Sequence, residues 1–134
     1  MTSIEEHKKA VNELESDMLE KIRLNLVSER QKIIGFVASE ASANCFAILL
    51  HKRNLISAGF NVNHRWFASI ERAGDKFPFD FPHKDKLLEL LVKQENLRHR
   101  LCYGRSKSAG EAEEAIEIFF EIKRIVEEDI GEDL

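Results

Sequence analysis

The chain has 134 residues, of which 43% are hydrophobic and 33% are charged, and its formal net charge is −4. This length is typical of one domain, and this composition can bury a core, which excludes a disordered chain. The negative balance excludes a generally basic nucleic-acid-binding protein but leaves room for a local basic cleft. We therefore expect residues 1–134 to form a single domain.

Signatures of metals and cofactors are missing from the sequence. Cys45 and Cys102 lie far apart in apolar surroundings without a CxxC motif or a Cys/His cluster, which predicts reduced thiols and no zinc site. Glycine-rich nucleotide loops and the HExxH and GxSxG motifs do not occur. A ferritin-like di-iron site would need ExxH pairs on two helices, which are also missing. We expect no metal and no cofactor.

The N-terminal sequence MTSIEEHKKA is acidic and polar, unlike a secretory signal peptide. The longest apolar run near the middle, CFAILL, is too short to span a membrane. These features predict a cytoplasmic protein without a membrane partner.

Helical periodicity runs through the first half of the chain. Apolar residues between Ile4 and Leu26 recur every three, four or seven positions, which predicts an amphipathic helix. The sequence TSIEE at its start fits a capping box in two registers. A second capping box, SERQ, precedes a longer helix with many small residues, predicted from Arg30 to about Ala58. Gly59 would stop this helix.

The second half continues the helical pattern after one loop. Asn63 is expected to cap a brief helix through HRWFASIERA, and GDKFPFDFP, with two prolines and three phenylalanines, predicts a loop pinned to the core. A leucine-rich helix extends roughly from His83 to Cys102, and a last helix begins at a capping box from Ser108. The tail IGEDL is expected to fray. The predicted fold is all-α, an up-and-down bundle of four main helices with a short extra helix.

The basic stretch LRHRLCYGRS, residues 97–106, has two interpretations. Basic side chains near a helix end meet the negative pole of the helix dipole and need no other role. Alternatively, Arg98 shares a helix face with Leu101 and Cys102, and its guanidinium would then point to the apolar side and need a partner. A planar group with five donors is well suited to binding an anion or a phosphate.

A second basic segment joins HKRN to NHRW and contains Arg53, His64, Arg65 and Trp66. The simpler interpretation is a solvated helix end followed by a helix cap. The alternative is a second basic patch in which Trp66 offers a stacking surface. The glutamates of the first and last helices alternate with basic residues, which is typical of solvated faces.

The order of these elements resembles the HEPN superfamily, small α-helical domains named for higher eukaryotes, prokaryotes and nucleotide binding. The resemblance covers roughly residues 30–130: a helix rich in alanine ending in HKRNLISAGF, a turn with NHRWF, a leucine-rich helix running into LRHRLCYGRS, and a capped final helix. LCYGRSKSAGEAEEAIEIF is similar to the branch found beside small nucleotidyltransferases. The resemblance implies a homodimer with Arg98 and Tyr103 lining a cleft between the subunits.

Many HEPN proteins carry an arginine, a polar residue and, after a short spacer, a histidine that together serve metal-independent RNA cleavage in toxins. Arg98 and His99 match the first two positions, and Tyr103 stands where the histidine would be, as in the branch beside nucleotidyltransferases. A phenol accepts a proton near neutral pH far less readily than an imidazole does. The resemblance therefore favours binding over cleavage.

Three functions are compatible with this interpretation. The first is a HEPN-like bundle, without catalysis or weakly active, that binds a nucleotide, RNA or a partner nucleotidyltransferase. Its expected binding residues are Arg98, Tyr103, Arg100, His64, Arg65 and Arg53. The second is a toxin-type endoribonuclease that needs no metal and uses Arg98, His99 and Tyr103 as catalytic residues. The third is a structural or interaction bundle without a ligand.

Overall fold

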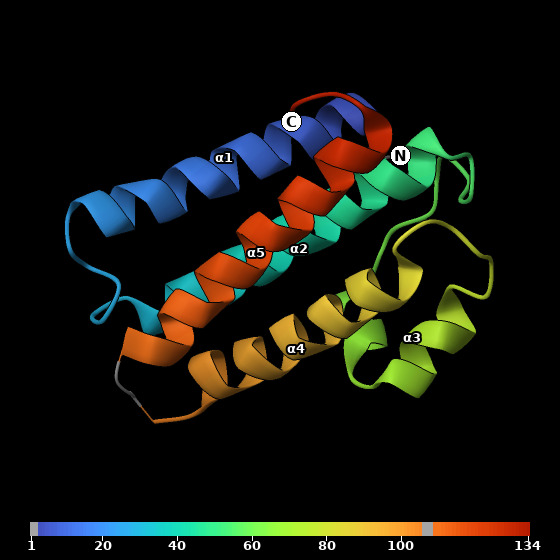
Figure 1. Ribbon diagram of the computed structural model, residues 1–134. Coiled ribbons are helices and arrows are strands. Elements are labelled where there is room, and N and C mark those ends of the chain that lie inside the picture. The colour runs from blue at the N-terminus through green and yellow to red at the C-terminus, as the bar shows by residue number, and fades with distance from the viewer. Residues whose placement is uncertain (1–2, 106–108) are drawn as a thin grey trace.

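The computed structural model describes residues 3–105 and 109–134, and its regular structure in these ranges is helical (Figure 1). The elements are α1 (Ile4–Arg23), α2 (Gln31–Lys52), the 3₁₀ helix η1 (His64–Phe67), α3 (Ile70–Lys76), α4 (Lys84–Tyr103) and α5 (Ala109–Ile130). Four long helices and the short α3 confirm the predicted all-α bundle.

Helix α2 lies at the centre and packs against α1, α4 and α5. The start of α1 lies beside the second half of α2, where His7 contacts Asn44 and His51. Lys32 at the start of α2 bonds to the Cys102 carbonyl near the end of α4, and Arg53, just after α2, pairs with Asp129 near the end of α5. Consecutive long helices therefore alternate in direction, as the up-and-down prediction required (Figure 1).

Helix α2 is apolar around most of its circumference because three helices cover it. Ala38, Ala41 and Cys45 are fully buried, and such small side chains let neighbouring helices approach closely. In the part of the chain that the structure describes, α2 alone is long and apolar enough to cross a membrane, although the run CFAILL by itself is too short. However, 78% of that apolar stretch is buried inside the bundle, which is typical of the core helix of a soluble domain.

Two helices end earlier than the sequence pattern predicted. Helix α1 stops at Arg23 and α2 at Lys52, because Asn25 and Asn54 adopt left-handed φ angles of 57° and 55°. After α2, the Leu55 amide donates to the Leu50 carbonyl, the bond that closes a Schellman-type helix end. The prediction that α2 continues to Ala58 and stops at Gly59 is therefore wrong, since asparagine tolerates the left-handed conformation as well.

Side-chain caps set three of the helix starts. Oxygens of Ser3, Asn63 and Ser69 accept hydrogen bonds from backbone amides at the starts of α1, η1 and α3, at 3.2, 2.9 and 3.1 Å. The Ser69 cap divides the brief helix predicted through HRWFASIERA into η1 and α3. SERQ is not a capping box, since Arg30 precedes α2 without a side-chain cap bond. The start predicted at Ser108 lies outside the described residues.

The proline-containing loop is pinned to the core, as predicted. Phe77 is fully buried and Phe81 is 7% exposed. The Phe77 ring stacks on Phe67 at 5.6 Å and meets Phe46 of α2 edge-on at 5.1 Å, arrangements that aromatic rings favour. This cluster fixes η1 and α3 against α2 and α4.

Gly35 marks the closest approach of α2 and α4. A Cβ atom there would stand only 2.8 Å from the Cβ of Leu101, so Gly35→Ala would push the helices apart. We expect it to lower the free energy of unfolding by about 1–3 kcal/mol, although alanine favours helix more than glycine does. Urea unfolding measures the change. Gly74→Ala is the matched control within a helix, since no atom lies within 4 Å of its added Cβ; an equal loss there would contradict the close approach.

Glu132 holds the C-terminal tail to the first two helices. It accepts hydrogen bonds from Lys8 Nζ at 2.6 Å and from Lys52 Nζ at 3.2 Å, so the tail predicted to fray is held. These bonds, that of Lys8 first, lower the pKa of the Glu132 carboxyl.

A group with a lowered pKa stabilises the fold above its ordinary pKa, and this stabilisation is lost as the pH falls through the lowered value. The free energy of unfolding should therefore decrease below about pH 4.5, the ordinary value for this carboxyl. Glu132→Gln is expected to flatten that decrease in urea titrations at pH 3 to 7. Glu128→Gln, at an exposed pair with Arg124, should leave the profile as it is; the same flattening by both variants would contradict the assignment.

Candidate functional site

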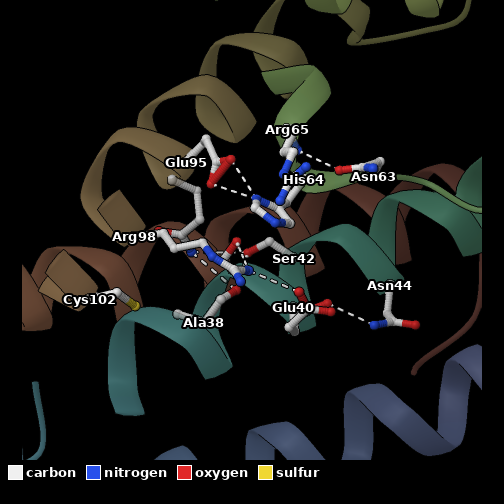
Figure 2. Close-up of polar contacts among 12 residues, drawn as sticks. Ala38, Glu40, Ser42, Asn44, Asn63, His64, Arg65, Glu95, Arg98 and Cys102 are labelled. Carbon is white, nitrogen blue, oxygen red and sulfur yellow. Dashed lines mark hydrogen bonds and ion pairs between the residues drawn. The ribbon is translucent and has the colours of Figure 1, made fainter. Parts of the chain in front are cut away.

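Arg98 points from α4 toward α2 rather than into solvent (Figure 2). Its Nη1 donates to Glu40 Oε1 at 2.9 Å and to Ser39 Oγ at 3.3 Å. The guanidinium carbon lies 5.0 Å from the centre of the Phe36 ring, within the range of a cation–π contact. Only 11% of the side chain is exposed. Arg98 is therefore a partnered guanidinium on the inner face of the helix, the second of the two interpretations that the sequence left open.

The pairing leaves part of the Arg98 guanidinium available. Within residues 3–105 and 109–134, Nε and Nη2 of Arg98 make no hydrogen bond. A guanidinium offers five N–H donors in a fixed plane, and Glu40 and Ser39 use only those on Nη1. The N–H groups on Nε and Nη2 are of the kind that bind anions.

His64 stands beside this arginine and pairs with Glu95. Nδ1 of His64 lies 2.6 and 3.0 Å from the two oxygens of Glu95, one helical turn before Arg98 on α4. Since a carboxylate only accepts hydrogen bonds, we assign the proton to Nδ1, which leaves Nε2 of the neutral ring as an acceptor. The Asn63 cap of η1 holds the backbone from which this ring projects.

A shallow groove lies beside Arg98 and shares Glu40 and His64 with its surroundings. It has a volume of about 520 Å³ and is lined by Glu40 and Ala43 of α2 and by residues 61–66, which include His64 and Arg65. Figure 2 shows the side chains of Arg98, His64 and Glu95 on the same side of α2, next to Glu40. The lining of the groove thus includes Arg65, the ring of His64 and one carboxylate, that of Glu40.

The other two residues of the proposed catalytic motif lie apart from Arg98. The rings of His99 and Tyr103 contact each other at 5.4 Å between centres, and Tyr103 is 76% exposed. Among the described residues, neither makes a hydrogen bond to Arg98. The histidine that lies beside the Arg98 side chain in space is His64 of η1 (Figure 2).

The remaining predicted binding residues are dispersed over the bundle. Arg100 Nε donates to Glu111 at 3.0 Å, on the side of α5. Arg53 forms a two-pronged bond with Asp129 at 2.7 and 2.6 Å, and this bond raises the pKa of Arg53. Both arginines therefore serve helix-to-helix pairing outside the groove. Arg65 lines the groove and is exposed.

Trp66 and the two cysteines offer little chemistry of their own. The Trp66 ring packs on Phe77 at 5.9 Å and carries Lys76 Nζ at 5.2 Å from its centre, so it belongs to the aromatic cluster as well as to the groove wall. Both thiols are free. Burial raises the pKa of Cys45 and of Cys102, which makes them poor nucleophiles.

Sequence reasoning missed the acidic partners of this site. Glu40 is the sole charged residue between Ile33 and Leu50, and an isolated charge in an apolar helix needs a partner. Glu95 precedes Arg98 by three residues and therefore shares its helix face. Both signals are visible in the sequence, but only the fold shows which cation each carboxylate meets.

No family model, no curated protein and no solved structure matches the chain.

Proposed function

We propose that this chain is a HEPN-like helical bundle that binds the phosphate group of a nucleotide or of RNA beside Arg98, and that binding rather than cleavage is its main role. The observation that carries the proposal is the guanidinium of Arg98, held by Glu40 and Phe36 with Nε and Nη2 unbonded among the described residues. Two parallel N–H donors of one guanidinium match two oxygens of a phosphate. Arg65 would add positive charge in the neighbouring groove.

Glu40 limits the strength of this binding. Its carboxylate, 35% exposed, neutralises much of the charge of Arg98 at 2.9 Å. A phosphate that binds Arg98 has to share the guanidinium with the Glu40 carboxylate or displace that carboxylate. The two negative groups repel each other when both lie close to Arg98. We therefore expect modest affinity that decreases as salt rises.

A second protein chain is expected to cover the neighbouring surface. Ile33 and Phe36 are 45% and 47% exposed on the open side of α2. Lys32 donates to the Cys102 carbonyl at 3.0 Å, which brings Tyr103 to the same end of the bundle. A second copy of the chain, or a partner nucleotidyltransferase, seated here would bury these side chains and turn the groove into a cleft.

Arg98→Ala is expected to weaken binding of a fluorescent single-stranded RNA or of ATP at least tenfold, because the fork of donors is lost. Fluorescence anisotropy and calorimetry at low salt measure the affinity. Arg98→Lys keeps the charge but loses the two parallel donors, so its affinity should lie between those of the wild type and Arg98→Ala. Glu40→Gln should bind several times more tightly than the wild type.

Arg124→Ala removes one positive charge at an exposed pair with Glu128, outside the groove, and serves as the control. Circular dichroism confirms that each variant is folded. An Arg98→Ala protein that binds as well as the Arg124→Ala protein would overturn the proposal.

Metal-independent RNA cleavage is a second candidate function, favoured by the position of His64. With Nδ1 held by Glu95, Nε2 is available to accept the proton of a 2′-hydroxyl, as a general base requires. Arg98 would stabilise the charge that develops on the phosphate.

If the chain cuts RNA in the presence of EDTA, His64→Gln and Arg98→Ala are expected to lower the rate at least a hundredfold, since each removes a group that acts in the transition state. Tyr103→Phe should change it less than threefold. Gel analysis of a labelled RNA measures the rate. If Tyr103→Phe loses cleavage while His64→Gln stays active, the reaction belongs to the motif of Arg98, His99 and Tyr103 instead. If the wild-type protein does not cut RNA, binding is left as the function.

A further inference from the structure

A pair of histidines joins α1 to the end of α2, away from Arg98. His7 is 6% exposed, and its Nδ1 lies 2.7 Å from Asn44 Oδ1. The amide nitrogen of Asn44 donates to the Glu40 carbonyl at 2.8 Å, so the oxygen of Asn44 faces His7 and accepts. Nδ1 of His7 therefore carries the proton, and Nε2 has a free lone pair.

Both histidines have an unsatisfied nitrogen. The ring of His51 lies 5.5 Å from that of His7, centre to centre, at an angle of 32°. In the described part of the chain, Nε2 of His7 and Nε2 of His51 are both buried without a hydrogen-bond partner. Such atoms are rare in folded proteins, because an unpaired buried polar group costs about 1–3 kcal/mol.

We propose that a divalent transition-metal ion, Zn²⁺ or a similar borderline ion, binds between Nε2 of His7 and Nε2 of His51. Neutral imidazole is a preferred ligand of such ions. With metal–nitrogen distances of about 2.0–2.1 Å and tetrahedral angles, two ring centres lie roughly 5 Å apart. The observed 5.5 Å is close to this separation.

The surroundings of the pair fit this role. The hydrogen bond from His7 Nδ1 to Asn44 is the kind of outer contact that orients a metal-binding histidine. The charges of Lys8 and Lys52, each next to one histidine, are offset in part by Glu132, which bonds to both.

The site is a two-ligand site. Among residues 3–105 and 109–134, no group of three or more His, Cys, Asp or Glu side chains is placed to hold a metal. Because both Nε2 atoms are buried without the metal, water would complete the coordination after a small movement of the partly exposed His51 ring. We therefore infer reversible binding that ties α1 to α2, rather than a permanent structural metal.

Titration of the metal-free chain with ZnCl₂ tests this inference. We expect calorimetry at pH 7.5 to show one ion per chain. At free zinc tenfold above the dissociation constant, the midpoint of thermal unfolding should rise by about 5 °C. His51→Gln should abolish both the binding and the rise, and His7→Gln should do the same if it folds. Ring NMR signals of His7 and His51 should shift together in the wild-type chain.

Two further variants identify the site. His99→Gln removes an exposed histidine at the other end of the bundle and should bind zinc like the wild type. His64→Gln should as well, since the His64–Glu95 pair lies in the groove. Zinc binding that survives in His51→Gln, or that is lost in His64→Gln or His99→Gln, would overturn the inference, as would the lack of saturable binding to the wild type.

Discussion

The burial of α2 on three sides is the constraint on which the rest of the structure depends. A helix surrounded in this way needs small residues where its neighbours pass: Gly35 faces Leu101 of α4, and Ala38 and Ala41 are fully buried. The side-chain amide of Gln94 in α4 donates to Ser42 of α2 and to the Ala115 carbonyl of α5, at 3.0 and 2.9 Å. These contacts fix the relative height of three helices and so decide which side chains of α4 face α2.

The candidate site is a consequence of that packing. Glu40 is carried into the bundle by an otherwise apolar helix face, and a partly buried carboxylate needs a cation. Arg98 lies opposite at the right height and pairs with it. The carboxylate of Glu40 orients the guanidinium and the Phe36 ring supports it, while Nε and Nη2 make no hydrogen bond among the described residues.

Local signals predicted the helices well and their ends less well. Periodicity and the Ser3 cap define α1 because both act within a few residues. The end of α2 at Lys52 was missed because a left-handed asparagine can replace glycine. The tail was expected to fray, yet Glu132 finds two lysines more than 70 residues away in sequence. No local pattern contains such a long-range partner.

The sequence by itself determined the all-α fold and the pinned aromatic loop, because periodicity and local composition are properties of neighbouring residues, and it left two directions open for Arg98. Only the tertiary structure decided which residues meet. His64 lies beside Arg98, and Tyr103 packs against His99. Arg53 and Arg100 pair with Asp129 and Glu111 of α5. The physical reason is that hydrogen bonds between helices depend on their relative height and rotation, which the packing around α2 sets.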